Sequence, residues 1–105
     1  MIYKPEFLYL TTTGWKTGQP HEIEIWYVTH HGRFYLVAES GEKTHWVRNI
    51  RHSPTVSFYA EGGQHSGQGR VVDPNSESEL AGAVRTLMDA KYDWSEGVIV
   101  ELAPE

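Results

Sequence analysis

Residues 7–20 read Phe-Leu-Tyr-Leu-Thr-Thr-Thr-Gly-Trp-Lys-Thr-Gly-Gln-Pro. The aromatic and β-branched run over 7–13 predicts a strand that stops at a loop bounded by two glycines. Glycines four residues apart let backbone N–H groups converge, and the side chains of Thr13, Lys16 and Thr17 add two hydroxyls and an ammonium group. The loop is therefore either a phosphate-binding nest or an ordinary tight turn. It is not a Walker loop, because no Lys-Ser/Thr pair follows the second glycine.

Beyond this loop, residue alternation and β-branched runs predict further short strands over 21–29, 33–38, 55–60, 68–73 and 98–102. Apolar residues at helical spacing predict a short helix over 44–51. A longer helix is expected to start at the segment 73–76, with a capping box formed by Ser76 and Glu79, and to end near residue 92. We therefore expect one domain over 1–105 of the mainly β (α+β) class. Its expected form is a small antiparallel barrel of about six strands, with one short and one longer helix on its outside or rim.

Composition excludes several classes of function. The chain has 105 residues and no cysteine, so disulfide frameworks, thiolate metal sites and cysteine nucleophiles are excluded. The formal net charge of −5 argues against general attraction to nucleic acid or to anionic membranes. No apolar run is long enough for a membrane span, and the first residues lack the apolar core of a signal peptide. We therefore expect a cytoplasmic protein without stable membrane insertion.

One segment runs against the acidic balance of the chain. No carboxylate occurs between Glu42 and Glu61, whereas three Lys or Arg and two His residues lie there. These cations either form a solvated helix face paired with acids elsewhere, or they face an anion together with the glycine loop. The six histidines show no paired ligand spacing, so we predict no metal site.

Three motifs resemble those of the deazaflavin-dependent nitroreductase family. The segment 10–20, LTTTGWKTGQP, matches the family's common TTTGRKTGQPR. The segment 46–54, WVRNIRHSP, matches its W-x-x-N-[LI]-x-x-x-P helix motif. An aliphatic strand ends at residues 37–40, and an aromatic loop with Tyr92 and Trp94 precedes the last apolar strand. The resemblance covers nearly the whole chain in order.

This resemblance implies a split β-barrel homodimer that binds coenzyme F-420, or FMN in some relatives. Such proteins pass hydride to a quinone, a nitro compound or another small acceptor. Unpaired edges of a barrel with few short strands also favour a homodimer. Ser40 and Tyr92 are the candidates for catalytic hydrogen bonds, and Tyr92 and Trp94 for acceptor binding. The residues expected to bind the cofactor are Thr13, Gly14, Trp15, Lys16, Thr17, Gly18, His21, Ala38, Glu39, Ser40, Lys43, Trp46, Arg48 and Asn49.

Two positions depart from the family motif. Trp15 stands where the motif usually has arginine, and His21 stands where it often has arginine. Two fixed cations are therefore missing from the expected phosphate site. This leaves open a second hypothesis, a non-catalytic flavin- or deazaflavin-binding or sensing module, and a third, a domain that binds no flavin and shares only the fold.

Overall fold

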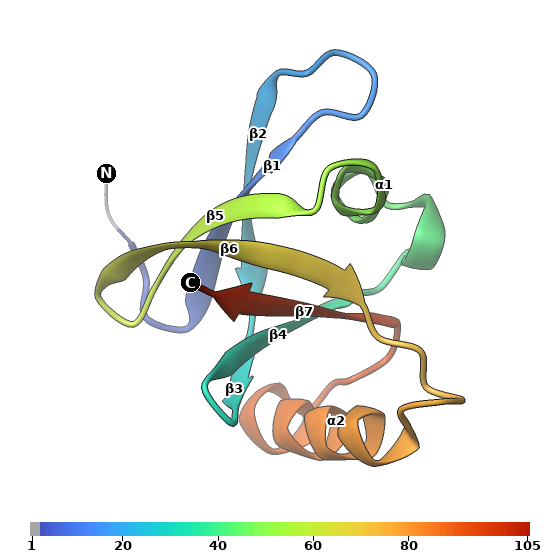
Figure 1. Cartoon of the computed structure of the whole chain (residues 1–105). Coiled ribbons are helices and arrows are strands. Elements are labelled where there is room, and N and C mark those ends of the chain that lie inside the picture. The colour runs from blue at the N-terminus through green and yellow to red at the C-terminus, as the bar shows by residue number, and fades with distance from the viewer. Residues whose placement is uncertain (1–2) are drawn as a thin grey trace.

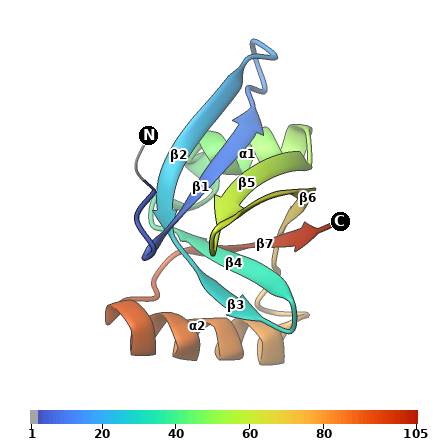
Figure 2. The same cartoon turned by 90° about the vertical axis from the view of Figure 1, so that its left-hand side faces the viewer.

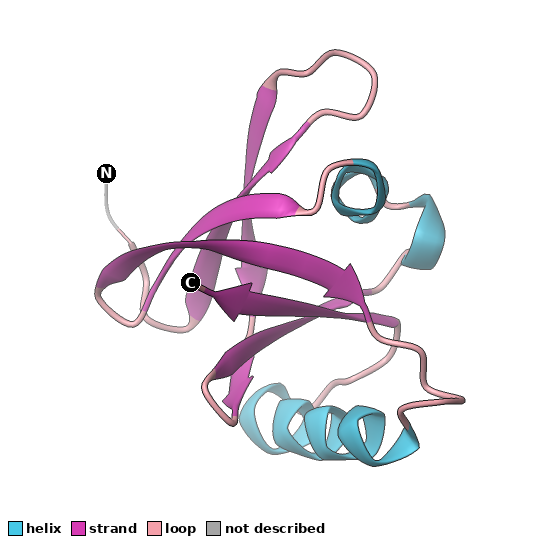
Figure 3. Cartoon of the chain, viewed as in Figure 1, coloured by secondary structure: helices cyan, strands magenta, loops and turns pink. Residues whose placement is uncertain are grey.

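The computed structural model describes residues 3–105 and shows one antiparallel sheet, two α-helices and a short 3-10 helix, Gly41–Lys43 (Figures 1 and 3). The strands are β1 (Phe7–Thr13), β2 (Pro20–Trp26), β3 (Val28–His30), β4 (Arg33–Ala38), β5 (Thr55–Ala60), β6 (Gly63–Val71) and β7 (Val98–Pro104). The helices are α1 (His45–His52) and α2 (Ser78–Tyr92). The predicted mainly β barrel with one short and one longer helix is confirmed.

The sheet is curled, and its two edge strands follow each other directly in the sequence. Its strand order is β2-β1-β5-β6-β7-β4-β3, and only Tyr27 separates the edge strands β2 and β3. The sequence pattern predicts this segment as one strand, which is why seven strands are found where about six were expected. The strand breaks at Tyr27 because its two halves pair with different partners, β1 and β4.

Side chains from α2 hold the backbone at this break. The Tyr27 N–H donates to the Tyr92 hydroxyl at 3.1 Å, and the Lys91 ammonium donates to the Tyr27 carbonyl at 2.9 Å. The Tyr92 hydroxyl also lies 2.7 Å from the Glu6 carbonyl oxygen. A buried peptide group that leaves the sheet must find other partners, and here α2 provides them.

Two apolar clusters occupy opposite faces of the curled sheet. One fills the barrel interior, where Trp46, Val47 and Ile50 of α1 close one end against residues such as Leu10 and Phe58. The other lies outside the barrel under α2, where Val84 and Met88 are fully buried. Figures 1 and 2 show α1 beside the projecting β1–β2 hairpin and α2 at the opposite end of the molecule. No helix within residues 3–105 is long and apolar enough to cross a membrane.

Two predicted boundaries are wrong. β6 begins at Gly63 rather than near residue 68, because the polar stretch 63–68 pairs with β5 along its whole length. α2 begins at Ser78, so no capping box forms at Ser76. The preceding carboxylates have local partners instead: Asp73 accepts the Asn75 N–H at 2.9 Å, and Glu77 accepts two hydrogen bonds from Arg70. These contacts hold the segment before α2 in turns.

Candidate functional site

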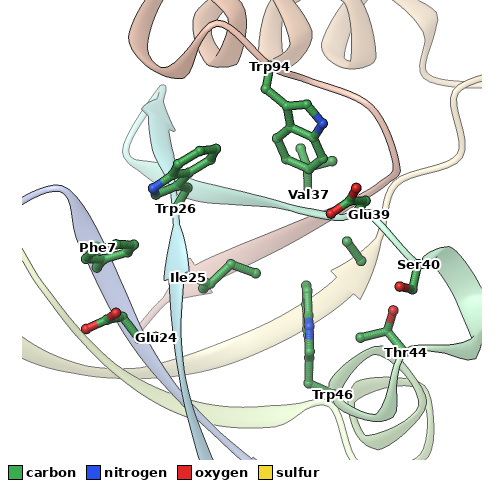
Figure 4. A pocket seen from close by; sticks show the side chains of 11 residues that line it. Phe7, Glu24, Ile25, Trp26, Val37, Glu39, Ser40, Thr44, Trp46 and Trp94 are labelled. Carbon is green, nitrogen blue, oxygen red and sulfur yellow. The ribbon is translucent and has the colours of Figure 1, made fainter.

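Two cavities lie side by side at the end of the barrel that α1 closes, and Thr44 and Trp46 line both of them. The first, which we call the basic cavity, has about 520 Å³ and is lined by Gly14, Trp15, Lys16, Thr17, His21, Glu22, Ile23, Thr44, His45, Trp46, Arg48 and Asn49. The second, the aromatic cavity, has about 600 Å³ and is lined by Phe7, Glu24, Ile25, Trp26, Val37, Ala38, Glu39, Ser40, Thr44, Trp46 and Trp94 (Figure 4).

The glycine loop and the basic helix α1 line the same cavity. The sequence alone did not show whether these two segments lie together. Lys16 comes from the loop, and His45 and Arg48 come from α1. Within residues 3–105, neither Lys16 nor Arg48 takes part in an ion pair. Arg51 instead fits the alternative in which the basic residues pair with acids elsewhere in the chain, because the Glu42 carboxylate accepts two hydrogen bonds from its guanidinium, at 2.7 and 2.6 Å. The Arg51 hydrogen bond is also the main cause of a pKa of Glu42 below its ordinary value.

The loop folds back on itself rather than forming an open nest. Gly14 N–H donates to the Gln19 carbonyl at 2.7 Å, and Gly18 N–H donates to the Gly14 carbonyl at 2.9 Å. Both glycine amides are therefore engaged inside the loop. A Cβ atom at Gly14 would lie 2.8 Å from Thr17 Oγ1 and 2.9 Å from His21 Nε2, so a side chain here would force these two residues to move. The loop therefore presents Lys16 and Thr17 side chains to the cavity rather than these glycine amides.

Asn49 ties this loop to α1. Its Nδ2 donates to Thr12 Oγ1 at 2.9 Å, and its Oδ1 accepts the Trp15 N–H at 2.9 Å. Asn49 and Thr12 are only 4% and 2% exposed. The asparagine of the helix motif therefore positions the loop through two buried or half-buried hydrogen bonds.

The Trp15 indole lies close to two cations that line the basic cavity with it. Lys16 Nζ lies 4.8 Å and Arg48 Cζ lies 5.8 Å from its ring centroid. The indole is 38% exposed, so it does not belong to the core. Its face attracts the cations weakly in the absence of an anion.

Thr44 is a half-buried residue of the shared wall whose hydroxyl oxygen is buried without a hydrogen-bond partner. Its Oγ1 is the one buried side-chain oxygen or nitrogen within residues 3–105 that has no hydrogen-bond partner. The residue occupies the N-cap position of α1, but its hydroxyl does not cap the helix. A buried hydroxyl without a partner is costly unless a ligand supplies one. Thr44 therefore brings an unused hydrogen-bonding group to the wall that the two cavities share.

The aromatic cavity has indole rings on opposite sides. Trp46 stands on one side, and Trp26 and Trp94 form an edge-to-face pair on the other, with centroids 6.0 Å apart (Figure 4). Ala38 is held close to Gly97, whose Cβ would lie 2.2 Å from the Ala38 carbonyl oxygen. Such walls offer stacking surfaces to a flat ring.

Tyr92, which the sequence predicts as a catalytic and acceptor-binding residue, lines neither cavity. Its hydroxyl is engaged with backbone groups of Glu6 and Tyr27, and its ring stacks on Trp26 with centroids 4.6 Å apart. Tyr92 thus supports the wall residue Trp26 from behind.

The structure brings most of the other predicted residues together. Among them, Gly14, Trp15, Lys16, Thr17, His21, Arg48 and Asn49 line the basic cavity, Ala38, Glu39, Ser40 and Trp94 line the aromatic cavity, and Trp46 lines both. Thr13, Gly18 and Lys43 line neither cavity. No three His, Asp or Glu side chains of residues 3–105 form a group that could hold a metal ion.

Sequence reasoning missed Thr44, Phe7, Glu24, Ile25 and Trp26 in these walls, as well as His45 and two β2 residues on the basic side. His45 belongs to the basic segment already noted, and its helical spacing from Arg48 was the available signal. Thr44 and Trp26 carry no motif, and only the curl of the sheet places them here.

Comparison with known proteins gives one family match. The model of the family described as F420H(2)-dependent quinone reductase matches residues 2–98. No curated protein matches the chain. The solved structure of an F420-H2 dependent reductase is similar at 20% identity, with a TM-score of 0.68 over 97% of both chains.

Two further solved structures have a similar fold. A conserved hypothetical protein from Mycobacterium tuberculosis is 23% identical, with a TM-score of 0.77 over 95% of this chain and 73% of that chain. A FAD-binding protein from Mesorhizobium loti is 17% identical, with a TM-score of 0.72 over 95% of this chain and 81% of that chain. At these identities the likenesses establish the fold alone.

Proposed function

The chain belongs to the F420H(2)-dependent quinone reductase family of oxidoreductases, and on this basis we propose that it passes hydride from reduced coenzyme F-420 to a small organic acceptor such as a quinone or a nitro compound. The observation that carries the proposal is the pair of adjoining cavities, one basic and one aromatic, with Thr44 and Trp46 as their common wall. A cofactor with a phosphate-bearing tail and a flat ring needs this combination of surfaces.

When bound, the coenzyme supplies the redox chemistry: it loses a hydride and a proton, and a quinone acceptor gains both to become a hydroquinone. Lys16 and Arg48 would hold the phosphate, because both are cations without an ion-pair partner within residues 3–105. Thr44 Oγ1 would gain the hydrogen bond that it lacks. These features fit the coenzyme without requiring a metal.

The aromatic cavity would bind and shield the reacting ring. Ala38, Glu39 and Ser40 follow one another along its rim at the end of β4, where they would run along the ring edge. Ser40 is exposed and can offer a hydroxyl to the ring or to the acceptor. Trp46 packs from the α1 side, and its indole would exclude water from that face.

Titration with oxidised coenzyme F-420 and, separately, with FMN tests cofactor choice through the visible spectrum of each. Anaerobic addition of the quinone menadione to the reduced complex then tests turnover through reoxidation of the coenzyme. Coenzyme binding without acceptor-dependent reoxidation would instead support the non-catalytic binding or sensing module. Tighter binding of FMN than of coenzyme F-420 would contradict the proposed cofactor.

Substitution of Lys16 tests the position of the phosphate. Lys16→Ala removes one charge-assisted contact, worth roughly 1.5–3 kcal/mol, so coenzyme affinity should fall roughly 10- to 100-fold while folding is little affected. Lys4→Ala is the matched control, because it removes the same charge from an exposed residue that lines neither cavity. Unchanged affinity in Lys16→Ala would remove the loop from the proposed site.

We also propose that the protein works as a homodimer. The edge strands β2 and β3 offer unpaired backbone groups, and the aromatic side chains of Trp15 and Trp26 are more than one-third exposed. Light scattering should give about twice the chain mass of 12.0 kDa. A persistent monomer that binds coenzyme at micromolar concentration would contradict this assignment.

A further inference from the structure

The two adjoining cavities have opposite charge. Among residues 3–105, the charged residues that line the aromatic cavity are Glu24 and Glu39, and no Lys, Arg or His lines it. The basic cavity carries two fixed cations and two histidines against the single carboxylate of Glu22. The polarity of the site therefore reverses across the wall formed by Thr44 and Trp46.

The carboxylate of Glu39 is available to a ligand. Glu39 is exposed, forms no ion pair or side-chain hydrogen bond within residues 3–105, and its side chain lies between Trp94 and Trp46 in Figure 4. A carboxylate repels a phosphate-bearing tail, and the proposed function places the anionic end of the coenzyme in the basic cavity.

The Glu24 carboxylate lies beside Phe7, on the side of β2 that faces away from Trp46 (Figure 4). Its Oε2 accepts a hydrogen bond from the Tyr9 hydroxyl at 2.9 Å, across a directly paired position of β1 and β2. Burial raises the pKa of Tyr9, and Glu24 adds to the rise, so the phenol keeps its proton and remains a donor to the carboxylate. This contact fixes a negative charge near Phe7 and Trp26 at the rim of the aromatic cavity.

Aromatic faces and carboxylates attract the same kind of ligand. Indole rings bind cations through their electron-rich faces, and a carboxylate adds a direct charge interaction. Trp26 and Trp94 form such a wall opposite Trp46, and Glu39 lies between the two sides. A neutral ring would gain only the stacking, and an anion would be repelled.

We propose that the aromatic cavity selects flat acceptors that carry a positive charge, such as quinones or nitroaromatics bearing an ammonium group, over neutral and anionic ones. This inference rests on the proposed function, because it names the class of acceptor that the same site takes. Glu39, between the tryptophans, is the main residue that determines the specificity, Glu24 adds a more distant negative charge at the rim, and the tryptophans supply the stacking surface.

Three nitrobenzenes that differ in charge test the proposal by binding alone. The cation is para-nitrobenzyl-trimethylammonium, the neutral probe is its carbon isostere para-neopentyl-nitrobenzene, and the anion is para-nitrophenylacetate. Their dissociation constants are measured by quenching of tryptophan fluorescence, with the protein saturated in oxidised coenzyme F-420. The cation should bind about ten-fold more tightly than its isostere at low salt, and the anion should bind most weakly.

Variants assign the preference to the two carboxylates. Glu39→Gln should reduce the preference for the cation roughly three-fold and Glu24→Gln less, and the double variant should keep only the part that the indole faces supply. Glu79→Gln is the matched control, since Glu79 is exposed on α2 and lines neither cavity. High salt should also shrink the preference, because exposed charges are screened.

Equal affinities for the three probes would overturn the proposal, and so would a cation preference that is undiminished in the double variant. An equal loss of all three probes in Glu39→Gln would show that this side chain holds the coenzyme ring instead, and would equally overturn it. If coenzyme F-420 does not bind, the proposed function fails. The charge ranking measured on the coenzyme-free protein still decides whether the cavity selects cations.

Discussion

Replacing Asn49 by alanine is expected to loosen the loop between β1 and β2 and to lower both stability and coenzyme affinity. The variant loses two neutral hydrogen bonds of 2.9 Å, each worth about 1 kcal/mol net. The Trp15 amide can find water, but Thr12 is 2% exposed and its hydroxyl would be left unpaired, at a cost of about 1–3 kcal/mol. We therefore expect the free energy of unfolding to fall by roughly 2–4 kcal/mol.

A thermal melt measures this loss, which corresponds to roughly 4–8 °C in Tm for each kcal/mol in a domain of this size. Titration with coenzyme F-420 supplies a second readout, because Asn49 positions the loop that carries Lys16. The matched background is Thr12→Val, which removes the hydroxyl while keeping the volume. In that background Asn49→Ala should lower the free energy of unfolding by at least about 1 kcal/mol less than it does in the parent, since no unpaired hydroxyl remains. Unchanged Tm and unchanged affinity in Asn49→Ala would refute the reasoning.

Three further outcomes are expected. Trp15→Arg should tighten coenzyme F-420 by about ten-fold and FMN less, because it adds a fixed cation at an exposed rim position and removes no core packing; isothermal titration showing weaker binding of both would contradict this. Thr44→Val should leave Tm unchanged or raise it, since it removes an unpaired buried hydroxyl, while coenzyme affinity falls roughly 2- to 10-fold. Lower Tm with unchanged affinity would instead assign that hydroxyl to the fold. The Arg70 hydrogen bond, followed by that of the Asp73 backbone, lowers the pKa of Glu77 to about 2. Because the folded pKa lies below the usual value of 4.5, the ionised Glu77 stabilises the folded state at pH values above 4.5, and this stabilisation is lost as the pH falls toward 2. The Tm difference between the parent and Glu77→Gln should therefore vanish over that interval.

The barrel could be predicted from sequence because its strands alternate and its turns carry glycine. The stretch 63–68 was missed because Gly, Gln, His and Ser have little apolar pattern, yet β5 pairs with all of it and β7 with its last residues. Gly67 shows why glycine stands there: a Cβ would lie 2.1 Å from the Ala103 carbonyl oxygen. Backbone closeness of this kind leaves no apolar signal in the sequence.

The candidate site could be predicted where a motif names the residues, as at Lys16 and Asn49. It could not be predicted where tertiary contacts make the site. Thr44 is significant because of what surrounds its hydroxyl, and Trp26 because Tyr92 stacks behind it. The start of α2 was misplaced for a related reason. Arg70 of β6 donates two hydrogen bonds to Glu77, and no local rule for helix capping takes such a contact into account.

The break at Tyr27 has a consequence for the order of folding. The hairpins β1–β2 and β3–β4 can form from nearby residues, but the bond from Tyr27 N–H to the Tyr92 hydroxyl joins residues 65 positions apart. Contacts so distant along the chain form slowly, so the barrel should close late, when α2 docks. The same docking brings Tyr92 behind Trp26 and Trp94 beside it. A refolding chain would therefore recover its two local hairpins before it recovers the wall against which the acceptor binds.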